Sequence, residues 1–226
     1  MRTMQGVNVT TKRSSRAKRL QLKVSGLDGQ ACLTVPFKTP EIEIERFLRQ
    51  HTDWLANIQA EIPPENYIGD GSVFALHGDN YRVVWCLDQN GIRLSVAESV
   101  VYVGGKREHI GDCLKLWLYG EAYKLFCKRS AEYAAIIGQE VTKITVRDVR
   151  SRWGSCSRNG KLMFCWRLIF APSPVFDYVV AHEVAHLDEF NHSSAFWEVV
   201  ARLCPEWKKH RKWLARNSAV MHSYRF

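Results

Sequence analysis

The chain has 226 residues, of which 46% are hydrophobic and 12% aromatic, and a formal net charge of +9. Such a composition is sufficient for a packed core and excludes an intrinsically disordered chain. No apolar run approaches the roughly 18 residues that a membrane helix needs, and the basic segment 1–25 lacks the apolar centre of a signal peptide. We therefore expect a cytoplasmic protein that does not enter a membrane.

The seven cysteines are scattered and include no CxxC pair. An odd number without such pairs argues against a disulfide framework and against a structural zinc site made of cysteines. We expect most of them to be small buried side chains in a reducing compartment. Cys156 is interpreted as a packing residue beside a tight turn at Gly154, and the alternatives are a thiol ligand to a metal and a redox switch.

Lys and Arg residues concentrate at both ends of the chain. Residues 1–25 contain seven of them and no acidic residue, and residues 202–226 contain seven with only Glu206. Clusters of this kind can bind nucleic acid or acidic partners, but a solvated surface has the same composition. The charge pattern therefore leaves DNA as an alternative partner and favours the solvated surface.

Residues 7–37 have the pattern of β-structure. Alternating apolar residues predict strands at Leu20–Val24 and Ala31–Phe37, with the turn residues Gly26–Gly29 between them. Thr39 as N-cap and Pro40 at the first helical position then predict a helix that continues to about Ala60. Its apolar stripe predicts packing on the hairpin.

Residues 66–103 predict a second β-region, divided by turn residues at Gly78–Asn80 and Asp88–Gly91 that favour hairpins. The predicted strands are Val73–Leu76, Tyr81–Leu87, Ile92–Val96 and Val100–Val103. The following pair Gly104-Gly105 is the predicted domain boundary. It separates an N-terminal α+β region, residues 1–104, from a second domain, residues 105–226.

The second domain is predicted to alternate helices and strands. Its predicted elements are a helix over about 108–137 ended by Gly138, a strand at Val141–Val149, a strand at Leu162–Phe170, a helix over about 175–190, a helix at Ala195–Cys204 capped by Ser193 or Ser194, and a last helix opened by Pro205. Leu162–Phe170 is interpreted either as an edge strand that pairs with an extended substrate or as a buried core strand. The tryptophans of the last two helices are interpreted as core or as a cover of the preceding helix.

The segment His182-Glu183-Val184-Ala185-His186 has the HExxH pattern. Residues four positions apart lie on one face of a helix, so His182 and His186 can bind the same metal ion, with Glu183 beside them to hold a water molecule. A catalytic zinc site uses three protein ligands, and His192 is the candidate for the third. A zinc ion in such a site lowers the pKa of its bound water, which is the water that Glu183 can hold.

The chain resembles the YgjP-like metallopeptidases, which are related to the SprT-like and WLM zinc proteases. The resemblance covers nearly the whole chain and is carried by four segments. They are the basic hairpin start Arg13–Leu20, the sequence Ser151–Cys156 around Trp-Gly-Ser-Cys, the HExxH segment Asp177–Leu187, and Asn191–Ser193 with Phe196-Trp197 and Trp213-Leu214.

This resemblance implies a zincin-like catalytic domain in which the HExxH helix packs on a small sheet. It also implies a Zn²⁺ ion bound by His182, His186 and His192, with Glu183 as base and a peptide or protein as substrate. Tyr178, Arg152 and His222 are candidates for a second electrophile, although structural roles fit them as well. Two alternatives remain: a DNA-associated protein, including a protease of DNA-bound proteins, and a zinc module without catalysis.

Overall fold

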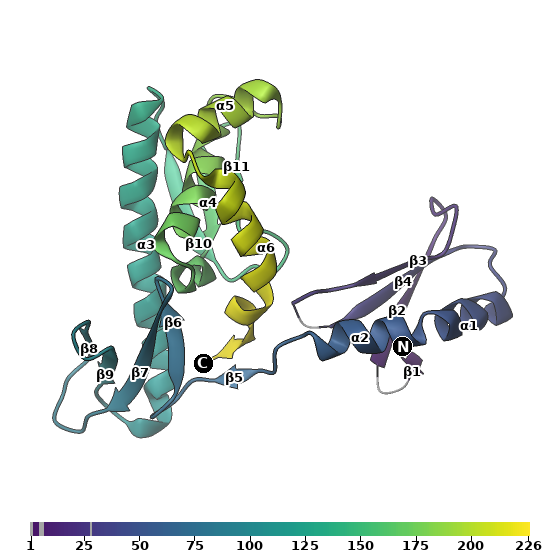
Figure 1. The fold of residues 1–226 in the computed structure, drawn as a ribbon, viewed down its shortest axis with the longest axis horizontal. Coiled ribbons are helices and arrows are strands. Elements are labelled where there is room, and N and C mark those ends of the chain that lie inside the picture. The colour runs from purple at the N-terminus through teal and green to yellow at the C-terminus, as the bar shows by residue number, and fades with distance from the viewer. Residues whose placement is uncertain (1, 5–6, 28) are drawn as a thin grey trace. The chain divides into compact units, whose positions relative to one another are not determined.

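A computed structural model describes residues 2–4, 7–27 and 29–226 and divides the chain into two compact units (Figure 1). The first unit is Met1–Pro64 and the second is Glu65–Phe226. Both combine helices with small sheets, so the predicted α+β class is confirmed. Parts of the predicted basic segment and of the first predicted turn lie outside the described residues; these are Met1, Gln5, Gly6 and Asp28.

The first unit contains a four-stranded sheet with the order β1-β2-β4-β3. Its strands are β1 (Arg2–Met4), β2 (Val7–Ser14), β3 (Gln21–Val24) and β4 (Ala31–Pro36). β3 and β4 form the predicted antiparallel hairpin, and β2 runs parallel to β4 on its other side. The alternation of β4 places Ala31, Leu33 and Val35 on one face of the sheet, where they are buried.

Two helices, α1 (Glu41–Gln50) and α2 (Thr52–Ala60), share a hydrophobic core with this sheet. The prediction of one continuous helix is wrong because the chain breaks at His51. The side chain of His51 donates through Nδ1 to the carbonyl oxygen of Phe47 over 2.8 Å. The backbone N–H of His51 donates to the carbonyl oxygen of Leu48, and not to that of Phe47 as in a regular α-helix. The predicted Thr39 cap is also wrong, since the extended Pro40 is the N-cap and α1 begins after it.

The second unit opens with β5 (Asn66–Tyr67), followed by a sheet with the order β6-β7-β9-β8. The strands of this sheet are β6 (Val73–Leu76), β7 (Asp79–Trp85), β8 (Ile92–Ser95) and β9 (Val100–Val103). The β6–β7 hairpin is confirmed, and its loop residues His77 and Gly78 both have positive φ, as a type I′ turn requires. The second predicted hairpin is wrong, because β7 pairs in parallel with β9 and β8 pairs with the other edge of β9.

The predicted boundary at Gly104-Gly105 lies inside the second unit. Val83 and Val101 of the sheet share one hydrophobic core with Leu114 of helix α3 (Ile110–Ile136). The sheet and the helix bury their apolar faces against each other, so the β-region folds with the C-terminal part of the chain. The boundary between the two compact units consequently falls after Pro64 and not after residue 104.

A three-stranded sheet with the order β10-β12-β11 follows α3. Its strands are β10 (Lys143–Arg147), β11 (Gly154–Cys156) and β12 (Lys161–Cys165). The predicted strand to Phe170 is too long, because the chain turns after Cys165 into the buried 3₁₀ helix η2 (Trp166–Phe170). Of the two interpretations of this strand, the buried core strand is confirmed and the edge that pairs with a substrate is wrong. β12 is paired on both sides, and β11 is an edge of the sheet among the described residues.

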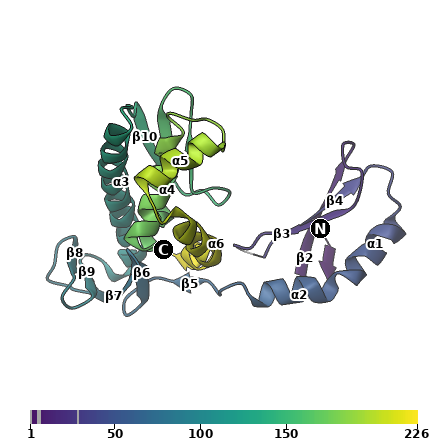
Figure 2. The same cartoon turned by 45° about the horizontal axis from the view of Figure 1, so that its top comes forward.

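Three helices, α4 (Ser173–Ala185), α5 (Ser194–Leu203) and α6 (Trp207–Ser223), complete the second unit. α4 packs between α3 and α6, as both views show (Figures 1 and 2). The final strand β13 (Tyr224–Arg225) pairs in parallel with β5, so the C-terminal residues contact the start of the same unit. In the part of the chain that the structure describes, no helix has both the length and the apolar character needed to cross a membrane.

Phe126 of α3 lies between two other rings in the core of the second unit. Its ring stacks on Phe164 of β12 at 4.3 Å and on Phe176 of α4 at 4.4 Å. We expect Phe126→Ala to lower the free energy of unfolding by about 3–5 kcal/mol, because it removes a fully buried ring and leaves a cavity. Chemical denaturation measures this loss, and Leu116→Ala on the exposed face of α3 is the control. Equal stability of the two variants would contradict the assigned packing.

Candidate metal centre

Helix α4 carries the HExxH segment and is fixed in the core by its own apolar residues. Phe176, Val179, Val180 and Val184 are buried. An ion pair also ties α4 to α3, since Arg129 Nε donates to Asp177 Oδ1 over 2.8 Å. A side chain on a helix held in this way has little freedom to move, which suits a metal ligand.

The helix ends earlier than predicted, and His186 is its C-cap. The rings of His182 and His186 still face the same region, with their centroids 5.1 Å apart. The next residues turn the chain back toward them. In this turn Asn191 Oδ1 accepts the N–H of Ser193, and Ser193 Oγ accepts the N–H of Phe196 as the predicted cap of α5.

This turn brings His192 to the other two histidines. Its Nε2 lies 3.3 Å from Nε2 of His182, and one ring nitrogen from each of the three residues lies within 4.8 Å of the others. Two ligands of a tetrahedral zinc ion, each 2.0–2.1 Å from the metal, are separated by about 3.3 Å. Among the described residues, no other group of His, Cys, Asp and Glu side chains has a comparable arrangement.

The hydrogen bonds and the burial of the rings also fit a metal. Nδ1 of His186 lies 2.9 Å from the carbonyl oxygen of Glu189, which can only accept, so Nδ1 carries the proton and Nε2 keeps its lone pair. Burial and then the neighbouring His186, His192 and Arg211 lower the pKa of His182 to about 3, and burial lowers the pKa of His186. Both rings are therefore neutral, as metal ligands must be.

Aromatic residues from α5 and α6 cover the three histidines. Phe196 stacks on His186 at 4.4 Å, and Trp197 lies parallel to His192 at 5.8 Å. Trp207 stacks on Trp197 at 4.2 Å. The interpretation of these tryptophans as a cover of the HExxH helix is confirmed for Trp197 and for Trp207, which stacks on it.

Glu183 is 6% exposed and lies beside strand β11. A Cβ atom added to Gly154 would lie 2.5 Å from Cγ and 2.6 Å from Oε1 of Glu183. Gly154 therefore provides the space that the carboxyl group occupies. Burial raises the pKa of Glu183 to about 8, and the positive charge of Arg152 acts in the opposite direction. A cation bound by the histidines would likewise favour the ionised carboxylate.

The YgjP-like metallopeptidase domain model matches residues 18–217. The chain belongs to this family. No curated protein matches the sequence. A solved structure that resembles the chain is the crystal structure of the metallopeptidase zymogen of Pyrococcus abyssi abylysin. Its sequence is 19% identical, the match covers 40% of this chain and 93% of that chain, and the TM-score is 0.37.

Membership in the YgjP-like family makes the chain a metallopeptidase, that is, a hydrolase of peptide bonds. It also implies a metal ion, and the second unit contains a three-histidine cluster suited to hold one. The predicted family is confirmed.

The other candidates of this YgjP-like chain lie at different distances from the cluster. The Tyr178 ring is 6.0 Å from that of His182, whereas His222 packs on Trp153 at 4.9 Å and contacts none of the three histidines. Burial raises the pKa of the half-buried Cys156 thiol to about 11, which keeps it protonated. Cys156 is not part of the histidine cluster, which agrees with the packing interpretation.

A groove of about 410 Å³ follows strands β11 and β12. Arg147, Arg152 and Lys161 line it, and no carboxylate does. Cys156 also lines this groove, and both Arg152 and Cys156 interact electrostatically with Glu183. Ser155, which follows Gly154, lines the groove as well, so the groove runs along the strand that lies beside Glu183.

The sequence reasoning missed Gly154 as a site residue. The Trp-Gly-Ser-Cys segment contains this glycine, but Glu183, against which it lies, is 29 positions further along the chain. Only folding brings the two residues together.

Proposed function

We propose that this metallopeptidase uses zinc, with His182, His186 and His192 as ligands and Glu183 as general base. The observation that carries the proposal is the convergence of three ring nitrogens within 4.8 Å, next to a buried carboxyl group. Imidazole suits zinc, and three protein ligands leave a position for a reactant. The exposure of His192 supports access from solvent.

When bound, a zinc ion would lower the pKa of water and polarise the carbonyl group of the scissile peptide bond. Glu183 accepts the proton of the attacking water through its carboxylate and delivers it to the leaving amine. The absence of a side chain at Gly154 leaves the space that this carboxylate occupies, and the neutral rings of His182 and His186 keep their lone pairs available.

A zinc module without catalysis is a weaker explanation of the site. Burying a carboxyl group costs free energy, and a purely structural metal site does not need one beside its ligands. Glu183 is buried, and β11 leaves space for it at Gly154. The catalytic proposal gives both residues a function.

Loss of the third ligand is the direct test of the metal site. We expect wild-type protein to contain about one zinc per chain, and His192→Ala to lose most of it on dialysis, because two ligands hold zinc weakly. Elemental analysis measures this content. His192 is exposed, so circular dichroism should show an unchanged fold.

The control for this test is His109→Ala, which removes an exposed histidine outside the cluster. It should keep both zinc and activity. Full zinc content in His192→Ala would mean that another group completes the site. Removal of zinc from the wild type by a chelator should abolish hydrolysis, and added zinc should restore it.

A further inference from the structure

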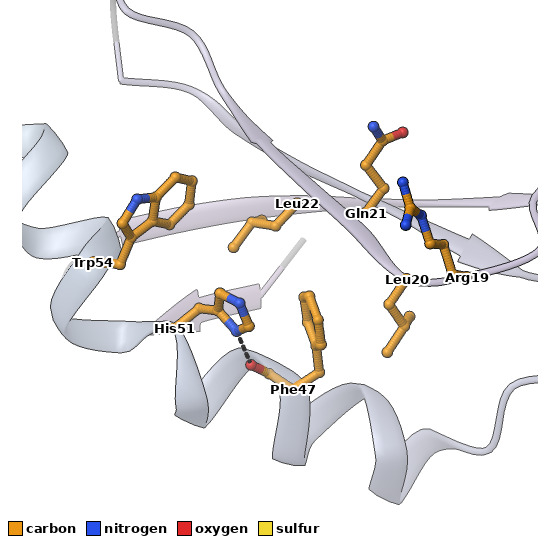
Figure 3. Close-up of a pocket in the computed structure, with 7 residues that line it drawn as sticks. All are labelled: Arg19, Leu20, Gln21, Leu22, Phe47, His51 and Trp54. Carbon is orange, nitrogen blue, oxygen red and sulfur yellow. Dashed lines mark hydrogen bonds between the residues drawn. The ribbon is translucent and has the colours of Figure 1, made fainter.

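The first unit contains an open groove of about 550 Å³ between its sheet and its helices (Figure 3). The segment that leads into β3 forms one wall, and the region where α1 meets α2 forms the other. The lining residues that matter here are Arg19, Leu20, Leu22, Phe47, His51 and Trp54. The groove belongs to Met1–Pro64 alone, and nothing in the proposed function uses it.

The helix wall is aromatic and held in place. The His51 ring stacks on Phe47 at 4.2 Å, and its Nδ1 donates to the carbonyl oxygen of Phe47 over 2.8 Å. Trp54 meets His51 edge to face at 6.3 Å and remains 43% exposed. This wall presents apolar surface without having to rearrange, which lowers the entropy cost of binding.

The opposite wall is the edge of a sheet. Within the described residues β3 pairs only with β4. The N–H of Ser25 donates to Gln30 on the β4 side over 2.9 Å, and backbone groups alternate in direction along a strand. The N–H and C=O groups of Leu22 and Val24 therefore point to the open side. An edge of this kind can accept one more strand.

The charge at the groove indicates what kind of strand it takes. Arg19 is the cation among the lining residues, no carboxylate lines the groove, and within the described residues Arg19 has no ion-pair partner. Residues 12–24 contain six Lys and Arg residues and no acidic one. A ligand with a carboxylate beside Arg19 complements this charge.

We propose that this groove binds an extended segment of another protein, in which apolar residues alternate along the segment and an acidic residue stands at the Arg19 end. The segment adds to β3 through its backbone, and its apolar side chains enter the space between Leu22 and Trp54. A single-stranded nucleic acid fits less well, since it needs a series of cations along its backbone and several free stacking faces, whereas Arg19 is the one Lys or Arg among the residues that line the groove. Phe47 and His51 already stack on each other.

Fluorescence anisotropy with the full-length Glu183→Gln chain tests this proposal, because that background limits cleavage of the probe. The probe is a labelled synthetic peptide in which valine and threonine alternate and aspartate stands at both ends. We expect binding that weakens about tenfold or more in Trp54→Ala and in Arg19→Glu. Ile42→Ala, a change at another exposed apolar residue of the same unit, should bind as before.

Two further probes separate the alternatives. A peptide that is N-methylated at every residue should lose binding, since neither of its edges offers β3 an N–H group. An oligothymidylate should not displace the unmodified peptide. No binding to the peptide, equal binding by Trp54→Ala and Arg19→Glu, or equal binding of the methylated peptide would overturn the proposal. Displacement of the peptide by the oligonucleotide would assign the groove to nucleic acid instead.

Discussion

The Glu183→Gln variant should keep about one zinc per chain and lose peptide hydrolysis by a factor on the order of 10²–10⁴, the usual contribution of a general base. The amide is nearly the same size as the carboxyl group, so it fits the space beside Gly154 that Glu183 occupies. It cannot accept a proton at neutral pH. The three histidines keep their ring nitrogens, and zinc content should therefore not change.

Elemental analysis and hydrolysis of a fluorogenic peptide library measure the two properties separately. Glu198→Gln is the matched control, because Glu198 is an exposed residue of α5 outside the histidine cluster. The variant Glu198→Gln should hydrolyse peptides like the wild type. If Glu183→Gln retains zinc together with wild-type hydrolysis, Glu183 is not the base and the mechanism is wrong.

The local part of this site could be predicted from the sequence. HExxH places two histidines and a glutamate on adjacent positions of one helical turn, and this depends only on helix geometry. His192 follows the helix after a short segment. This short separation along the chain is why the position of His192 beside the other two histidines could also be predicted. The cap at Ser193, which helps to orient that turn, is itself a local signal.

The non-local part could not be predicted. Apart from Arg167, the residues of Leu162–Phe170 are apolar, and apolarity does not distinguish a central strand followed by a 3₁₀ helix from one long strand. The predicted boundary at Gly104-Gly105 differs from the division into compact units after Pro64 for a similar reason. Glycines mark a turn, but they do not reveal that the strands before them and α3 after them share one core.

The break at His51 has a different cause. The apolar spacing of residues 42–58 is helical across the break, so periodicity predicts one helix. At the break the carbonyl oxygen of Phe47 accepts from the His51 side chain, and the backbone N–H of His51 donates to the carbonyl oxygen of Leu48. The bond from the His51 side chain fixes one wall of the groove in the first unit, so the feature that the sequence pattern missed is part of the surface we propose to bind a peptide.

The Gly154→Ala variant should lose hydrolysis by about 10²-fold or more and keep its zinc. The φ angle of Gly154 lies outside the left-handed region, so its backbone conformation accepts alanine. The added methyl group would lie 2.5–2.7 Å from three atoms of the Glu183 side chain. These distances are too short for a stable contact, and the buried carboxyl group has to move away from its position. A displacement of the carboxyl group by about 1 Å from its productive position is enough to lower the rate of hydrolysis about 10²-fold.

The matched control is Gly120→Ala, since a Cβ atom at Gly120 of α3 meets nothing within 4 Å. It should leave activity unchanged and can stabilise the helix by up to about 1 kcal/mol. The effect of Gly154→Ala should disappear in the Glu183→Gln background, because the methyl group acts through the carboxyl group that is already disabled. A further loss in that background, or a loss of zinc in the single variant, would show that the methyl group disturbs the histidines or the sheet. Strand β11 would then contribute to the metal site itself, and not only to the position of the base.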